Sequence, residues 1–221
     1  MNKQIKGVIF DMDGTLVDNM HFHQQAWFAF LDQYGVIVSE AEYHEKNAGT
    51  ITEIIPKFFP DIKDPAEIMR LGLEKEEIYR DLYSKEIRSL PGLETFLQVL
   101  SDAGILMGLA TAADRGNIDF TIDALGLRRY FHAIIGAEEV TYGKPHPDVF
   151  LKAASALGKN PDECMAFEDS TPGIRAAIAA GMKVTALATT HRRDELDIFP
   201  LHAIIENYVI SDPVGFLNGS S

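Results

Sequence analysis

Several features that define other protein classes are scarce or absent in this sequence of 221 residues. The single cysteine, Cys164, has no partner for an intrachain disulfide and lies in an apolar run typical of a core. No apolar stretch approaches the roughly 18 residues of a membrane-spanning helix, and Met1–Gln4 lead into an apolar run without a signal-like segment. We therefore expect a soluble cytoplasmic protein that does not bind a membrane.

Positive charge is also in short supply. The chain has 20 lysine and arginine residues against 33 aspartate and glutamate residues, so its formal net charge is −13. Nucleic acids require a basic face on their partner, so we expect no nucleic-acid binding, although a local field can still attract a small anionic substrate. No Gly-x-Gly-x-x-Gly motif follows the first apolar run, which disfavours dinucleotide binding. We expect a monomer.

What the sequence does contain is a regular alternation of short apolar runs and amphipathic helical patterns. Hydrophobic residues make up 46% of the chain, which is enough for a sizeable core. Strands that alternate with helices in this way are typical of an α/β fold with a doubly wound parallel sheet. The predicted strands lie at residues 7–10, 105–110, 133–136, 164–167, 184–188 and 203–205, and predicted helices lie at residues 93–103, 147–157 and 174–180.

The segment after the first predicted strand interrupts this alternation with helical patterns only. Phe22, Ala26 and Phe30 lie on one helical row, which indicates an amphipathic helix. An insert at this place would lie beside the carboxyl end of the strand, where we expect it to act as a lid hinged at residues 16–18 and 84–90. We therefore predict a core domain of residues 1–16 and 88–217, a helical cap domain of residues 17–87 and a disordered tail of residues 218–221.

Two aspartates at the end of the first strand are the most informative local feature. The apolar run Val8–Phe10 leads into Asp11, Met12, Asp13 and Gly14, a pattern that indicates a buried strand and a tight turn. In an open α/β sheet, ligands bind at the carboxyl ends of the strands. Two carboxylates this close are costly unless a cation or a reacting centre uses them, although a solvated turn would also fit this motif alone.

Other strand ends carry polar residues of the same kind. Thr111 follows the second predicted strand, Lys144 follows the third, and Glu168 and Asp169 follow the fourth. The two acids would also suit the first turn of a helix, where the macrodipole favours negative charge. Because the carboxyl ends of parallel strands meet at one edge of the sheet, the whole set indicates a single site.

This ordered set, Asp-x-Asp-x-Thr followed by a threonine, a lysine and an acidic pair, resembles the haloacid dehalogenase-like phosphotransferase superfamily over nearly the whole chain. Within that superfamily, the stretch DMDGTLVDNMHFHQQAW and the helical insert are similar to the β-phosphoglucomutase branch. The resemblance implies a Rossmann-like core with a small four-helix cap inserted after the first strand.

The chemistry of phosphate esters assigns roles to the first two aspartates. Unaided hydrolysis is extremely slow, and a carboxylate nucleophile divides the reaction into two steps through an aspartyl phosphate. We expect Asp11 to be the nucleophile. Asp13 is then expected to protonate the leaving oxygen and later to activate water.

The clustered acids would repel a phosphate, and bound Mg²⁺ would remove this repulsion because the ion prefers oxygen ligands. We expect Asp11 and Asp169 to bind the ion, and Glu168 either to bind it or to hold a bound water. The resemblance implies that the backbone carbonyl of Asp13 is a further ligand. Lys144 is expected to supply a second positive charge against the phosphoryl oxygens.

The loop after the second strand departs from the pattern of sugar phosphomutases. We expect Thr111 and the backbone amides of Ala112 and Ala113 to donate hydrogen bonds to the phosphoryl oxygens. The mutases of this branch continue with serine, lysine and asparagine, whereas this chain continues with Ala113, Asp114 and Arg115. Arg115 could restore one charge, because a guanidinium can bind a phosphate through two hydrogen bonds.

The cap segment departs from the mutase pattern as well. Thr52 occupies the position of an arginine that binds the distal phosphate, while a cap lysine is kept as Lys75, which would also fit a surface ion pair. The resemblance places His23 at the site, whereas a histidine stacked on Trp27 at the edge of the core is the alternative. The candidate specificity loop contains Gly49, Thr50 and Thr52.

These departures favour a phosphatase, because a weaker distal site favours release and hydrolysis over the two-way binding that a mutase needs. We expect a Mg²⁺-dependent enzyme that acts on a small phosphorylated metabolite such as a sugar phosphate. The alternatives are a sugar phosphomutase of the β-phosphoglucomutase type and a non-catalytic binding protein on the same fold. Haloacid dehalogenation fits poorly, because Asp13 would have no role in it.

Overall fold

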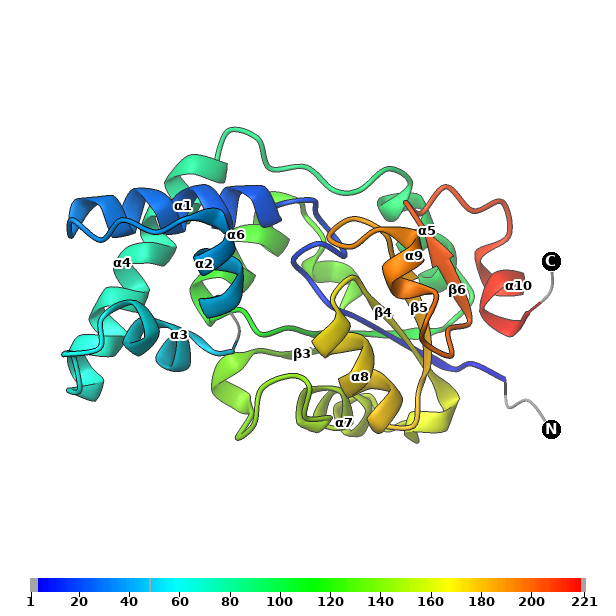
Figure 1. Cartoon of the computed structure of the whole chain (residues 1–221). Helices are drawn as coiled ribbons and strands as arrows, with labels where there is room; N and C mark the ends of the chain where they lie inside the picture. The colour runs from blue at the N-terminus through cyan, green and yellow to red at the C-terminus, as the bar shows by residue number, and fades with distance from the viewer. Residues whose placement is uncertain (1–3, 48, 220–221) are drawn as a thin grey trace. The chain divides into compact units, whose positions relative to one another are not determined.

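The computed structural model describes residues 4–47 and 49–219, and its chain divides into two compact units (Figure 1). The sheet unit contains the residues up to Asp18 and those from Ile87 onward, and the helical unit is Asn19–Glu86. None of the helices in these residues combines the length and the hydropathy that crossing a bilayer would require.

A parallel sheet of six strands, in the order β3-β2-β1-β4-β5-β6, forms the centre of the sheet unit. Its middle strands are buried on both faces, which explains why they are continuous apolar runs in the sequence. This arrangement confirms the predicted α/β class with a doubly wound parallel sheet. The strands are β1 (Gly7–Phe10), β2 (Leu106–Ala110), β3 (Ala133–Ile135), β4 (Cys164–Glu168), β5 (Lys183–Leu187) and β6 (Ala203–Ile205).

The strand order creates a switch point at β1. This strand pairs with β2 on one side and with β4 on the other, and all of these pairs are parallel. The chain therefore builds the sheet outward in one direction and then returns to build it in the other. In doubly wound sheets, the crevice for ligands lies at the carboxyl ends of the strands at this point.

One face of the sheet packs against α7 and α8, which lie on the same side of it (Figure 1). Ile9, Ala166 and Val184 project to this face and join a core with Phe150 of α7 and Ala177 of α8. The helices of the sheet unit are α5 (Leu93–Asp102), α6 (Arg115–Ala124), α7 (Asp148–Ala156), α8 (Thr171–Ala179), α9 (Arg193–Leu196) and α10 (Pro213–Asn218), with short 3₁₀ segments η1 (Arg128–Tyr130), η2 (Ala137–Glu139) and η3 (Pro161–Glu163).

The opposite face carries an aromatic cluster directly below the end of β1. Phe10 stacks on Phe167 with ring centroids 5.1 Å apart, and Phe96 and Tyr208 pack against both rings. The hydroxyl of Tyr208 donates a hydrogen bond of 3.2 Å to the carbonyl of Thr15. Because aromatic rings bury large areas in fixed orientations, this cluster gives the loop after β1 a rigid base.

The helical unit has a core of its own. Trp27, Phe30 and Leu31 of the first helix are buried against Ile55 and Leu71. Local signals start its later helices, since a capping box begins α2 and a proline occupies the first turn of α4. The helices are α1 (Met20–Gln33), α2 (Glu40–Lys46), α3 (Ile51–Phe58) and α4 (Pro65–Tyr83).

The end of the chain differs from the prediction of a disordered tail from residue 218 onward. Asn218 is the last residue of α10, and its side-chain oxygen accepts a hydrogen bond of 3.2 Å from the backbone amide of Ile5. The prediction is therefore wrong for Asn218, because a long-range contact holds this polar side chain. Ser220 and Ser221 of the predicted tail lie outside the described residues.

Candidate active site

Asp11 leaves the sheet at the carboxyl end of β1. Its backbone amide donates a hydrogen bond of 3.0 Å to the carbonyl of Phe167, so the parallel ladder with β4 continues up to this residue. The side chain is buried and only 8% exposed. The chain then turns sharply, because the amides of Thr15 and Leu16 both donate to the carbonyl of Met12. Asp13 lies half-buried inside this turn.

Lys144 bridges two of the acids that the sequence places at this edge. Its Nζ lies 2.6 Å from Oδ1 of Asp11 and 2.7 Å from Oε1 of Glu168. Burial opposes the charge of this lysine, but the adjacent carboxylates of Asp11 and Glu168 outweigh it and raise the pKa of Lys144 above its ordinary value. The ammonium therefore stays charged and fixed between the two acids.

Burial has the opposite effect on the carboxyl groups. Desolvation, assisted by the charges of Glu168 and Asp13, raises the pKa of Asp11 to about 7 even though Lys144 lowers it. Desolvation and the charges of Glu168 and Asp11 also raise the pKa of Asp169 well above its ordinary value. When these carboxyl groups are ionised, their negative charge exceeds what one lysine can balance. A second cation would therefore stabilise the ionised site.

Three carboxylates are placed to receive such a cation. Oxygen atoms of Asp11, Glu168 and Asp169 all lie within 4.8 Å of one another, and all three residues are buried. A donor set made only of carboxylate oxygens suits Mg²⁺ or another hard divalent cation. Within this set, Glu168 is also engaged by Lys144 and, through Oε2, by the amide and hydroxyl of Ser170.

Two glycines make this dense packing of carboxylates possible. Gly14 has a positive φ of 77°, and a Cβ atom on it would lie 2.0 Å from Oδ2 of Asp169. A Cβ atom on Gly173, in the first turn of α8, would lie 1.5 Å from Oε1 of Glu168. Both positions therefore exclude any side chain while the carboxylates keep their places.

The loop after β2 brings Thr111 to the same edge. This residue is 1% exposed, and its amide donates to the carbonyl of Ile135 over 3.0 Å. Its hydroxyl oxygen accepts a hydrogen bond of 3.1 Å from the amide of Ala113, so that amide is already engaged inside the loop, whereas we expected it to face a phosphate. The carbonyl of Ala113 accepts from Ala137, which ties Ala112 and its neighbours to the loop after β3.

Arg115 and the residue before it lie at the start of α6. Asp114 is the N-cap, and its side chain accepts a hydrogen bond of 2.8 Å from the amide of Asn117. The guanidinium of Arg115 is exposed, and its Nε lies 3.7 Å from Oδ1 of Asp119 one turn later. Helix capping thus accounts for the acid that replaces the lysine of the mutases.

In the helical unit, the buried Lys75 pairs with the half-buried His23. Nζ of Lys75 lies 3.0 Å from Nδ1 of His23 and 2.9 Å from Oε1 of Glu76. The ion pair with Glu76 that the alternative predicted is present, but Lys75 is only 2% exposed, so its location at the surface is wrong. The ring of His23 stacks on Tyr79 at 3.7 Å, while Trp27 lies against the ammonium of Lys75 instead.

The candidate specificity loop contributes to the start of α3. Thr50 is the N-cap, and its amide donates a hydrogen bond of 2.7 Å to Oε2 of Glu53. The hydroxyls of Thr50 and Thr52 lie 2.9 Å apart, and Gly49 has a positive φ of 117°. These hydroxyls already have partners close by in the sequence; Gly49 and Thr52 are exposed, and Thr50 is half-buried.

Two residues that our sequence analysis missed also contact the site. Thr189 and Thr190 follow β5, and their hydroxyls donate to the carbonyl of Gly14 and to Oδ2 of Asp169, respectively. The signal that could have revealed them is the one used for Thr111, namely hydroxyl residues directly after a predicted strand.

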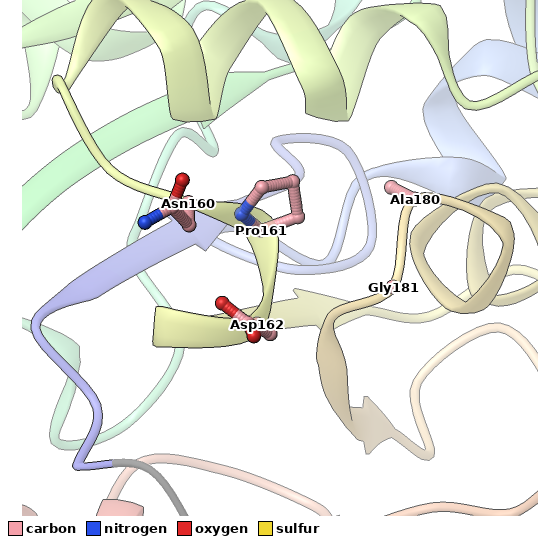
Figure 2. Close-up of a pocket in the computed structure, with 5 residues that line it drawn as sticks. All are labelled: Asn160, Pro161, Asp162, Ala180 and Gly181. Carbon is pink, nitrogen blue, oxygen red and sulfur yellow. The ribbon is translucent and has the colours of Figure 1, made fainter.

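The structure also contains a hollow of about 460 Å³ away from these residues. Figure 2 shows Asn160, Pro161 and Asp162 on the segment before β4, and Ala180 and Gly181 after α8. This hollow lies at the amino end of β4, whereas the acids cluster at the carboxyl end. It offers no catalytic group beyond one carboxylate, so we place the candidate active site at the acidic cluster.

Comparisons with known proteins agree with this fold. The model of the haloacid dehalogenase-like hydrolases matches residues 5–181. A fructose-1-phosphate phosphatase of Escherichia coli is 34% identical over 186 residues, which are 82% of this chain and 96% of that protein. Hexitol phosphatase A of the same organism is 33% identical over 224 residues, with coverage of 95% and 96%.

The crystal structure of a family IA hydrolase from Entamoeba histolytica has a TM-score of 0.87 and 26% identity, and the match covers 97% of this chain and all of that one. Two Arabidopsis thaliana relatives are longer, and the match covers 58% and 50% of their lengths. The strand order, the buried acids with their lysine, and a family match over most of the chain lead to one conclusion: this chain belongs to the haloacid dehalogenase-like hydrolase family.

Proposed function

We propose that this protein is a Mg²⁺-dependent phosphatase that hydrolyses a small phosphorylated metabolite, such as a sugar phosphate, through an aspartyl phosphate on Asp11. The buried cluster at the end of β1 carries this proposal. In it, Lys144 contacts Asp11 and Glu168 at 2.6 Å and 2.7 Å, and Asp169 completes a set of cation ligands. A carboxylate nucleophile beside fixed positive charge is the requirement of this type of phosphoryl transfer.

Asp11, Asp169 and Glu168 or a water on it would hold Mg²⁺, together with the backbone carbonyl of Asp13. Bound there, the ion would neutralise the carboxylates and draw negative charge from the phosphoryl group. Without a cation besides Lys144, burial keeps the pKa of Asp11 at about 7, so the nucleophile is only partly ionised at neutral pH. Lys144 and the hydroxyl of Thr111 would hold the phosphoryl oxygens.

The two aspartates divide the chemistry between them. An oxygen of Asp11 forms a bond to phosphorus as the bond from phosphorus to the ester oxygen breaks, and Asp13 gives its proton to that leaving oxygen. Asp13 then takes a proton from a water molecule. The resulting hydroxide attacks the phosphorus of the aspartyl phosphate, which releases phosphate and restores Asp11.

Hydrolysis is favoured over mutase activity by two observations. Two relatives that the match covers to 96% of their own lengths are named as a fructose-1-phosphate phosphatase and a hexitol phosphatase. In addition, Asp114 caps α6 at the position of a phosphate-binding lysine. The second candidate function, a sugar phosphomutase, is supported by the exposed guanidinium of Arg115, which could hold a distal phosphate.

Release of phosphate from a panel of sugar and polyol phosphates, with Mg²⁺ and with a chelator, tests the proposal. Asp11→Asn is expected to lower the rate by at least about 10⁴-fold, whereas Asp102→Asn, a change of the same kind at an exposed position, should leave it unchanged. Formation of glucose 6-phosphate from β-glucose 1-phosphate without free phosphate would indicate the mutase instead. Silence in both assays would favour a non-catalytic binding protein.

We also retain the predictions of a cytoplasmic location, a monomeric state, and no binding to nucleic acid or membranes. The net charge of −13 supports the absence of binding to nucleic acid, which requires a basic face.

A further inference from the structure

The turn after β5 reaches the acidic cluster through two consecutive hydroxyls. β5 pairs in parallel with β4, with Ala186 opposite Glu168, so the residues that follow these two strands meet at one edge. Thr189 donates a hydrogen bond to the carbonyl of Gly14, and Thr190 donates one to Oδ2 of Asp169. One short turn thus contacts both the loop after β1 and a carboxylate of the cluster.

Hydroxyl groups contact both carboxylate oxygens of Asp169. The ammonium of Lys144 contacts Asp11 and Glu168, and Asp169 accepts hydrogen bonds from the hydroxyl of Thr15 at 3.5 Å on Oδ1 and from the hydroxyl of Thr190 on Oδ2. Asp169 is 2% exposed, and a buried carboxylate requires such donors. The longer contact from Thr15 leaves Thr190 as the closer donor.

We infer that Thr190 is a positioning residue, which holds Oδ2 of Asp169 and thereby orients this carboxylate toward the cation that the proposed function requires.

The backbone of Gly14 also packs closely against Oδ2 of Asp169. A Cβ atom on Gly14 would lie 2.0 Å from Oδ2 of Asp169 and 2.8 Å from Oγ1 of Thr190. The carboxylate therefore lies between the turn after Asp13 and the turn after β5. The hydrogen bond from Thr189 to the carbonyl of Gly14 holds these two turns together. Rotation of the Asp169 carboxyl group would break its hydrogen bond to Thr190.

Partners that orient metal ligands in this way contribute to affinity, and their loss typically weakens metal binding by about 10- to 100-fold. The test is the dissociation constant of Mg²⁺ alone, measured by isothermal titration calorimetry on the full chain. Thr190→Val is expected to weaken binding by about 10- to 100-fold, and Thr190→Ser, which restores a hydroxyl, to return it near the wild-type value.

A matched control lies in β5, the strand that precedes this turn. Thr185 is buried, and its hydroxyl donates to Sδ of Met165 at 3.3 Å rather than to a carboxylate. Thr185→Val removes a hydroxyl by the same chemical change, and it should leave the affinity for Mg²⁺ unchanged. Because Thr190 is exposed, its valine variant is expected to fold; Thr190→Ala removes the same hydroxyl and decides the question if the valine variant does not.

Phosphate release supplies a second readout. In the Thr190→Val protein, the Mg²⁺ concentration for half-maximal rate should rise with the dissociation constant, while kcat at saturating Mg²⁺ stays close to wild type. A role limited to stability would instead lower the melting temperature equally with and without Mg²⁺ and leave the dissociation constant unchanged.

The outcomes separate this inference from the proposed function on which it rests. A wild-type protein that binds Mg²⁺ and a Thr190→Val protein that binds it equally well would overturn the role of Thr190 alone. Weak binding by Thr190→Ser, as weak as by Thr190→Val, would overturn it as well. A wild-type protein that binds no Mg²⁺ would overturn both.

Discussion

The metal-free protein should lose stability as the pH rises from about 5 to about 8, and Mg²⁺ should reverse this trend. In the unfolded chain Asp11 has its ordinary pKa of 3.8, whereas burial raises it to about 7 in the folded protein. Between these two values the folded protein holds a proton that the unfolded chain has released. Each increase in pH therefore favours the unfolded state, and the loss is complete once the pH exceeds the folded pKa.

The size of this effect follows from the shift. At about 1.4 kcal/mol per pKa unit, the buried charge of Asp11 costs on the order of 4 kcal/mol at pH values above 7. Asp169 adds a contribution of the same sign, because burial also raises its pKa. A loss of this order is a large fraction of the total stability of a domain, which is about 5–15 kcal/mol.

Mg²⁺ acts against this cost because it binds the ionised carboxylates. If one proton leaves as the ion binds, affinity should rise by about tenfold per pH unit below pH 7 and level off above it. Mg²⁺ should therefore raise the melting temperature strongly at about pH 8 and only weakly at about pH 5.

Differential scanning fluorimetry of metal-free and Mg²⁺-loaded protein across this pH range measures both effects. Asp11→Asn removes the titrating group, so without metal this variant should be more stable than wild type at about pH 8 and respond less to pH. A metal-free wild-type protein whose melting temperature holds or rises toward pH 8, relative to Asp11→Asn, would refute the reasoning.

Three further predictions concern single residues. Lys144→Met leaves Asp11 and Glu168 unpaired, so phosphate release should be abolished and the free energy of unfolding, from urea titration, should fall by about 3–5 kcal/mol; retained activity would contradict the role of this lysine. Gly173→Ala places a Cβ atom 1.5 Å from Glu168, so we expect weaker Mg²⁺ binding by calorimetry, and wild-type affinity would show that the carboxylate can move away. Cys164 is fully buried and burial raises its pKa to about 11, so a thiol reagent at about pH 8 should label it only on unfolding; rapid labelling of folded protein would count against this burial.

Much of the sheet could be predicted from local patterns. Each observed strand begins and ends within one residue of its predicted range, because strands buried on both faces must be short apolar runs bounded by turn residues. The start of α8 was predicted three residues too late, since Ser170 and Pro172 form its cap and first turn. The prediction of a disordered tail was wrong for Asn218 for a different reason, because this residue makes a long-range contact with Ile5 that no local pattern reveals.

By itself, the sequence determined the α/β class and which residues follow each strand, since both depend on neighbouring residues and on the period of the apolar pattern. That Asp11, Thr111, Lys144 and Glu168 would share an edge followed from the parallel direction of the strands. Their roles in catalysis remain our proposal.

Only the tertiary structure decided which of these groups touch. The strand order puts β4 beside β1, which brings Glu168 within 2.7 Å of the lysine that also binds Asp11, and puts β5 next, which brings Thr190 to Asp169. In the helical unit, Nζ of Lys75 contacts Nδ1 of His23, which is 52 residues away in the sequence. Such contacts join residues far apart in the chain, so they depend on how whole elements pack, and no local pattern encodes that packing.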